Sequence, residues 1–166
     1  MASAAVVLTS IGSDQWDAEV YAVLSIASRL AALVKSRAQT VQLAYQFWRL
    51  NSTLANFFRE VRNRMEGKHE LSTSPVTPER VEEAIRGLRQ VHLKIETLYE
   101  AARRARLTNN SVLAMPLRSI HTYGDDILEL AELLEAFQNS EGVQAVFDRS
   151  AQERARGEIY DLTEVE

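Results

Sequence analysis

Cysteine is absent from this chain of 166 residues, which excludes disulfides, thiolate nucleophiles and cysteine-ligated zinc. Glycine and proline are scarce, with six and three residues, and this favours long helices joined by short connections. No stretch approaches the roughly 20 apolar residues that a helix needs to cross a bilayer. The first residues, MASAAVVLTSIG, carry no basic side chain before their apolar run, unlike a secretory signal. We therefore expect a cytoplasmic protein without a membrane partner.

Recognised catalytic motifs are missing as well. No serine lies in a G-x-S-x-G turn, and no glycine-rich loop is present to hold a phosphate. Carboxylate pairs such as Asp125 and Asp126 are adjacent in sequence and therefore diverge on a helix. The net charge of −4 does not favour nucleic acid, because that binding depends on neutralising phosphates. We expect a protein that is not an enzyme, holds no cofactor and does not bind nucleic acid.

The residues that are present are typical of one globular domain rich in helix. Apolar residues make up 46% of the chain and recur at steps of three and four residues. This spacing predicts helices within residues 13–66, 78–106, 111–137 and 140–156. A continuous helix over the first range would be about 75 Å long at about 1.5 Å per residue, too long for a compact domain. Because the apolar face shifts within that range, we expect a break or kink at residues 50–53.

The first range contains two apolar stripes. Its positions expected to face the core are Trp16, Val20, Val23, Ala27, Leu30, Val34 and Val41, followed by Leu43, Phe47, Leu50, Leu54, Phe57, Val61 and Met65. Aromatic residues gather at Tyr45, Phe47, Trp48, Phe57 and Phe58. We assign them to the core, with a part exposed where the helix changes face.

Local signals mark several helix features. Thr77 can cap a helix that begins with Pro78, whose missing N–H costs nothing there. Asn110 or Ser111 can cap the next helix, in which Pro116 predicts a late start or a small kink. Gly124 lies on the apolar face, where the absence of a side chain lets another backbone approach closely.

The predicted fold is all-α, an antiparallel bundle of four to five helices with an extended C-terminal tail. Residues 1–12 form an N-terminal tail, residues 13–137 the helical bundle, and residues 138–166 a C-terminal helix with its tail. The short turn at residues 107–111 makes the helices on either side of it neighbours.

Two histidines and two carboxylates form a candidate metal site. If the chain turns near residues 108–109, His92 lies level with Asp125, and Glu96 lies level with His121. Each helix also has its histidine and carboxylate four residues apart, an arrangement that fits a mixed metal site. The same placement suits interhelical hydrogen bonds and surface ion pairs. We prefer the ion-pair interpretation and assign no metal.

The C-terminal segment, residues 141–166, carries the functional signal. Its helix is heavily charged and has a narrow apolar stripe, and the run GEIYDLTEVE then alternates β-type and acidic residues. Such a helix buries little alone, and an extended segment leaves its backbone groups unpaired. Another protein can take the helix in a groove and the strand along a sheet edge. The alternative is that the helix closes its own bundle and the last residues fray.

The residues predicted to contact a partner are Phe147, Ala151, Gly157, Ile159, Tyr160, Leu162 and Val165. The run VFDRSAQERARGEIYDLTEVE resembles the toxin-neutralising tail of bacterial type II antitoxins, in which a charged helix and a glycine precede a Y-x-L-x-x-V end. The positions that match are Phe147, Gly157, Tyr160, Leu162 and Val165. The resemblance covers this segment alone and implies a small toxin as partner. Those antitoxins have a small DNA-binding domain in front of the tail, whereas this chain has a long helical region, so operator binding is not implied.

We therefore interpret the chain as a non-enzymatic helical bundle that captures another protein with residues 141–166. One alternative is a self-associating, homodimeric structural or sensory bundle that uses its long heptad faces as a coiled coil does. A second alternative is a metal- or ligand-binding bundle built on His92, His121 and their carboxylates.

Overall fold

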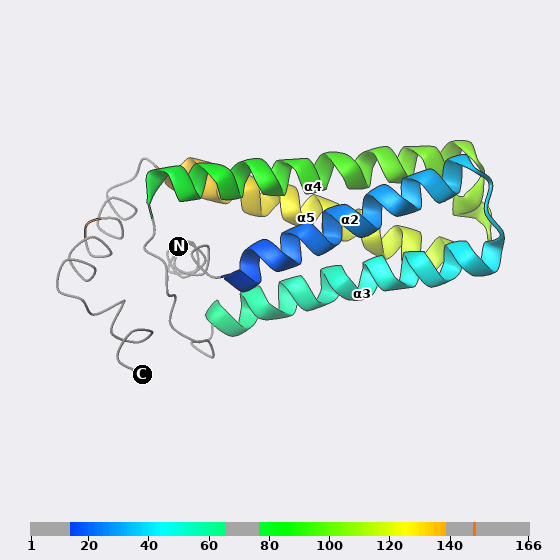
Figure 1. Ribbon diagram of the computed structural model, residues 1–166, viewed down its shortest axis with the longest axis horizontal. Helices are drawn as coiled ribbons and strands as arrows, with labels where there is room; N and C mark the ends of the chain where they lie inside the picture. Colours follow the sequence, from blue (N-terminus) through cyan, green and yellow to red (C-terminus); the bar gives the residue numbers. More distant parts are fainter. Residues whose placement is uncertain (1–13, 66–76, 139–147, 149–166) are drawn as a thin grey trace.

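A computed structural model describes residues 14–65, 77–138 and 148 of the chain (Figure 1). Within these residues it contains four long helices, one short 3-10 turn and no strand. The elements are α2 (Asp14–Lys35), α3 (Thr40–Met65), α4 (Pro78–Arg104), η1 (Leu107–Asn109) and α5 (Ala114–Phe137). The predicted all-α class is confirmed. No helix of this described part is both long enough and apolar enough to cross a membrane.

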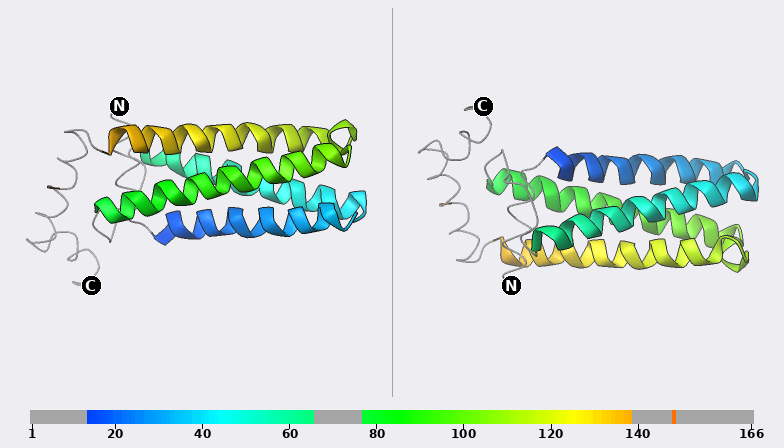
Figure 2. Two further views of the ribbon diagram at one scale, coloured as in Figure 1. Left: turned by 90° about the horizontal axis from the view of Figure 1, so that it is seen from above. Right: turned by 90° about the horizontal axis from the view of Figure 1, so that it is seen from below.

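The four helices form a bundle in which consecutive helices run antiparallel (Figures 1 and 2). α2 packs against α3 and α4, and α5 packs against the same two helices. The neighbours α2 and α4 therefore run parallel to each other, as do α3 and α5. We call the end at which α2 joins α3 and α4 joins α5 the closed end, and the opposite end the open end. Residues 66–76, which join α3 to α4, lie outside the described residues.

One apolar core fills the bundle. Its largest fully buried side chains are Leu30, Phe47, Leu50, Leu54, Leu88, Ile95, Leu98, Leu113, Leu117 and Ile120. Near the open end, the rings of Trp16 and Phe57 pack with their centroids 5.2 Å apart. The three- and four-residue spacing placed these faces correctly wherever the side chains are described, which leaves out Met65. Val41 is an exception, because the spacing placed it in the core and 81% of its surface is exposed.

The predicted break at residues 50–53 is wrong, because α3 runs through this range without interruption. The break lies at residues 36–39, where Arg37 adopts the left-handed backbone region with φ 59°. The N–H of Ala38 donates to the carbonyl oxygen of Leu33 at 3.1 Å, a hydrogen bond that commonly ends a helix at a glycine. An arginine holds the position that glycine usually takes, so the composition did not mark this break.

The predicted start of α4 is confirmed, whereas α5 begins at Ala114 after Leu113, so neither Asn110 nor Ser111 is its capping residue. Thr77 Oγ1 accepts a hydrogen bond from the backbone N–H of Arg80 at 3.1 Å at the start of α4. Asn110 Oδ1 accepts one from the N–H of Val112 at 2.8 Å just before α5. Pro116 lies in the first turn of α5, so the late start that it predicted is correct. The predicted helix at residues 140–156 lies outside the described residues, apart from Asp148, which is helical and exposed.

Candidate functional site

The residues predicted to contact a partner lie outside the part of the chain that the structure describes. They are Phe147, Ala151, Gly157, Ile159, Tyr160, Leu162 and Val165. Their role therefore stays a prediction. The described surface carries three further candidate sites: a His/carboxylate cluster between α4 and α5, a groove between α2 and α4, and an apolar surface at the closed end.

The His/carboxylate cluster bridges α4 and α5 in the half of the bundle nearer the closed end. His121 Nε2 lies 3.5 Å from Glu96 Oε2, as the predicted register requires. Asp125 follows one turn after His121, and one ligand atom from each of the three residues lies within 4.8 Å of the others. The His121 ring packs on the ring of Tyr99, with centroids 4.2 Å apart. Glu96 and Tyr99 of α4 thus hold the imidazole of His121 in place.

His92, the fourth predicted ligand, does not join this cluster. Its Nδ1 lies 3.0 Å from the carbonyl oxygen of Gly124. Because a carbonyl oxygen can only accept, the hydrogen of this contact belongs to Nδ1. His92 therefore ties α4 to the backbone of α5. The candidate metal ligands are reduced to Glu96, His121 and Asp125.

Three nitrogen and oxygen donors at this spacing can bind a divalent transition metal and leave positions open for water. Tetrahedral zinc holds neighbouring ligand atoms about 3.3 Å apart, a distance that rotation of partly exposed side chains can reach. Without a metal, a protonated His121 forms a surface ion pair with Glu96, worth up to about 1 kcal/mol. The geometry accommodates both arrangements.

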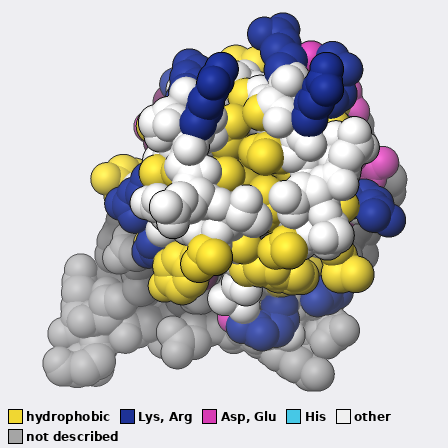
Figure 3. Space-filling view, turned by 90° about the vertical axis from the view of Figure 1, so that its right-hand side faces the viewer, with side chains coloured by type: hydrophobic (Ala, Val, Ile, Leu, Met, Phe, Trp, Pro, Cys, Tyr) yellow, Lys and Arg dark blue, Asp and Glu magenta, His cyan; other side chains and the backbone are white. Residues whose placement is uncertain are grey.

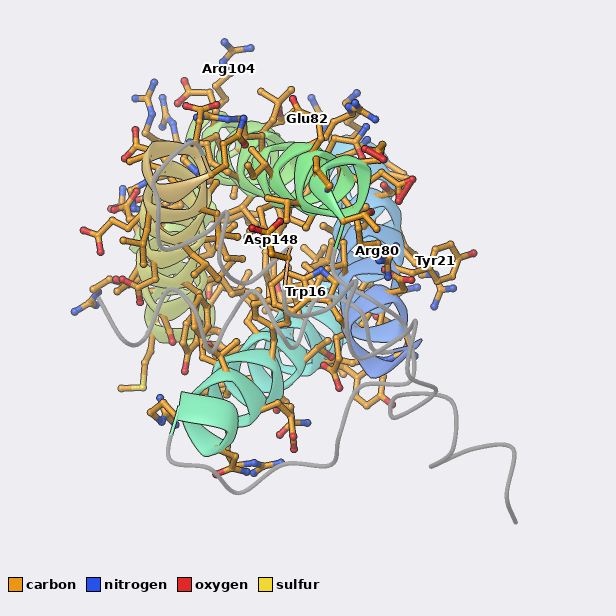
Figure 4. All side chains as sticks on the ribbon, turned by 90° about the vertical axis from the view of Figure 1, so that its left-hand side faces the viewer. Trp16, Tyr21, Arg80, Glu82, Arg104 and Asp148 are labelled. Carbon is orange, nitrogen blue, oxygen red and sulfur yellow. The ribbon has the colours of Figure 1, made fainter. Side chains whose placement is uncertain are left out.

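A shallow groove follows the contact between α2 and α4. It consists of a hollow of about 200 Å³ near the open end and a second of about 360 Å³ farther along, and Leu24 lines both. Tyr21 and Leu93 stand at its edges with 73% and 65% of their surfaces exposed, and Tyr21 points away from the bundle (Figure 4). Arg80 forms an ion pair with Asp17 across the groove. This mainly apolar lining suits binding of an apolar side chain.

An apolar surface with basic neighbours covers the closed end (Figure 3). The closed-end surface consists of Val41, Tyr45 and Trp48 on α3, and Val112 and Met115 near the start of α5, all of them exposed. Exposed basic residues at the same end are Lys35, Arg37, Arg103, Arg104 and Arg106. Grouped exposed hydrophobic residues of this kind mark a contact with another molecule.

The acidic residue nearest these cations is bound to two of them. Arg103 Nε donates to Glu100 Oε2 at 3.1 Å, and Arg104 Nε lies 3.5 Å from Glu100 Oε1. The hydrogen bond from Arg103 lowers the pKa of Glu100 below its usual value, so this carboxylate is ionised at neutral pH. No ion pair within the described ranges involves Arg37 or Arg106. The closed end therefore carries excess positive charge.

The sequence predicted that part of the aromatic group is exposed, and Tyr45 and Trp48 are that part, but it did not predict that they join residues of α5 in one surface. Val41, Tyr45 and Trp48 recur at four- and three-residue steps and so share one face of α3. Leu43, Phe47 and Leu50 follow the same spacing on the buried face of the same helix. Spacing alone does not distinguish the exposed stripe from the buried one, because both are apolar.

No family model, curated protein or solved structure matches this chain.

Proposed function

We propose that the chain is a non-enzymatic helical bundle that captures another protein with residues 141–166. The observation that carries the proposal is the distribution of apolar residues between the described helices and the C-terminal segment. The described helices share one continuous core, and the sequence of the C-terminal segment has its own thin apolar stripe followed by a run of residues that favour strands. A thin stripe on a charged helix gains little stability alone and more when a partner covers it. The groove between α2 and α4 offers a further apolar surface for contacts.

The resemblance of the tail to type II antitoxins implies a small toxin as the partner. In such a complex, the helix of residues 141–156 would lie in a groove of the toxin. Tyr160 and Leu162 would then fill pockets along a sheet edge, with main-chain hydrogen bonds providing part of the affinity. A small protein encoded beside this one is therefore the first partner to test.

Deleting residues 141–166 is expected to abolish partner capture and to leave the remaining helices folded. Binding of the purified partner, measured by calorimetry, should weaken by at least about a hundredfold, because the proposed contact residues are removed. Circular dichroism should still show cooperative thermal unfolding of the truncated chain.

The point variant Tyr160→Ala with Leu162→Ala should reproduce most of this loss, and Thr163→Ala is its matched control. If the truncated chain unfolds, the last helix belongs to the core and the proposal is wrong. Unchanged affinity of a folded, truncated chain would contradict it equally.

Metal binding is a second candidate function, and the geometry of Glu96, His121 and Asp125 favours it. These donors come from two helices, they lie within 4.8 Å of one another, and Tyr99 holds the imidazole. A bound divalent ion would link α4 to α5 and stabilise the bundle by mass action.

Adding zinc to the untagged protein is expected to raise its melting temperature, and His121→Ala should lower the zinc affinity by about tenfold or more. Calorimetric titration measures the affinity directly. Asp126→Asn is the matched control, because Asp126 is the neighbouring carboxylate outside the cluster. Equal zinc binding by wild type and His121→Ala would show that the cluster is an ion pair only.

A further inference from the structure

Charge is distributed unevenly along the chain. No Asp or Glu occurs between Glu19 and Glu60 or between Glu100 and Asp125, and both stretches pass through the closed end. The whole chain nevertheless has a net charge of −4, so its acidic residues are concentrated elsewhere. The last ten residues, 157–166, hold four acidic residues and no basic one. The closed end and the tail are therefore opposite in charge.

The tail and the closed-end surface also match in apolar character and in size. The tail interleaves Ile159, Tyr160, Leu162 and Val165 with its acidic residues, and the closed-end surface sets exposed hydrophobic residues beside cations. Eight residues of the tail, if fully extended, span about 26 Å. The closed end is about 20 Å across, since each of its helices is about 10 Å wide. One tail is long enough to cross it.

We infer that the closed-end surface binds residues 157–166 of a second copy of this chain, an inference that rests on the proposed role of the tail as a binding segment. The apolar side chains of the tail cover Val41, Tyr45 and Met115. Its carboxylates lie beside Lys35, Arg37 and Arg106. The contact buries apolar area that is otherwise in water and pairs charges that have no ion-pair partner among the described residues.

The head-to-tail direction of this contact is part of the same inference, and the position of the end of α5 supports it. α5 has 24 residues, so its last residue lies about 36 Å from the closed end. The segment that follows α5 thus starts at the open end, opposite the surface that it binds in the next copy (Figure 1). Such a contact is heterologous and joins copies head to tail, and each added copy offers a further tail and a further closed end. Association should therefore proceed beyond a dimer.

A second copy is favoured over an anionic lipid surface, which exposed aromatic and basic residues can also bind. The complementary acidic and apolar segment is present in every molecule, at the same concentration as the surface it fits. A partner that binds the tail more tightly would free the closed end and dissociate the assembly. Self-association would then protect both surfaces until the partner arrives.

Sedimentation velocity of the untagged full chain tests this inference. The average mass is expected to rise with protein concentration at low salt and to approach that of the monomer at high salt, which screens exposed charges. Lys35→Glu with Arg106→Glu should weaken association by about tenfold or more, and so should Glu158→Lys with Asp161→Lys. A mixture of these two variants should associate, since one supplies an unchanged tail and the other an unchanged closed end.

The matched control is Arg62→Glu with Arg86→Glu, two exposed cations away from the closed end, and it should associate as the wild type does. A constant monomer mass at all concentrations would overturn the inference and leave the proposed function intact if the tail still captures another protein. Association that survives the tail substitutions would also overturn it, because the surface would then bind itself. Binding to phosphatidylserine vesicles without self-association would assign the surface to a lipid. Failure of the proposed function is recognised separately, by unfolding of the chain that lacks residues 141–166.

Discussion

Replacing Phe47 with alanine is expected to lower the free energy of unfolding by about 3–5 kcal/mol. Phe47 has none of its surface exposed and is among the largest fully buried side chains of the described core. Truncation removes its contacts and leaves a cavity that four packed helices can fill only in part. A domain of this size has a free energy of unfolding of about 5–15 kcal/mol, so one substitution removes a large share of it. Urea denaturation followed by circular dichroism measures the change.

The matched control for this variant is Tyr21→Ala. Tyr21 is also an aromatic residue on a helix, but 73% of its surface is exposed. Its replacement should change the free energy of unfolding by no more than about 0.5 kcal/mol. Equal losses for the two variants would contradict the placement of Phe47 in the core.

Gly124→Ala is expected to destabilise the protein by about 1–2 kcal/mol, although alanine is the better helix former by about 1 kcal/mol. A Cβ atom at position 124 would lie 2.8 Å from Cγ2 of Ile95. Ile95 is fully buried, and its β-branched side chain has one preferred rotamer in a helix, so it cannot move aside. α4 and α5 would have to separate, which would also lengthen the hydrogen bond from His92 Nδ1 to the Gly124 carbonyl, now 3.0 Å.

Gly87→Ala is the matched control and is expected to have the opposite sign. A Cβ atom there would meet Cγ1 of Val20 at 3.6 Å, an ordinary contact, so the helix propensity of alanine should stabilise α4 by about 0.5–1 kcal/mol. In an Ile95→Ala background, the penalty of Gly124→Ala should disappear, because the clashing methyl group is gone. Stabilisation by both glycine replacements in the wild-type background would show that α4 and α5 approach less closely at Gly124. The four variants are Gly124→Ala, Gly87→Ala, Ile95→Ala and the double variant Ile95→Ala with Gly124→Ala. Thermal and urea unfolding measure whether each of them raises or lowers the free energy of unfolding.

Interactions between residues close in sequence determined the helix content and most of the helix starts. The hydrogen bonds at Thr77 and Asn110, and the late start of α5 at Pro116, are local in this sense, so short-range patterns reveal them. The first break was missed because Arg37 occupies a left-handed position without the usual glycine. Whether a residue accepts such strain depends on the packing of the helices on either side of it, and a sequence pattern does not contain that information.

The candidate sites, too, were predicted from the sequence only in part. The equal level of Glu96 and His121 followed from the position of one turn, and their 3.5 Å contact confirms it. The turn of His92 toward the Gly124 carbonyl depends on how closely two backbones approach, which spacing along one chain does not specify. The sequence indicated some exposed aromatic residues, but it did not show that Tyr45 and Trp48 lie beside Val112 and Met115, because these residues come from two helices that are distant in sequence.

The sequence alone determined that this chain is helical and which faces of its helices are apolar. It also determined that the tail is acidic and contains residues with a high propensity for strands. These properties depend on residues within a few turns of one another, or on composition. The tertiary structure decided which helices are neighbours, where the first helical range breaks, and that one apolar stripe on α3 faces solvent while another fills the core. Those outcomes depend on how four helices share one interior, and identical spacing along two stripes carries no information about which of them the other helices cover.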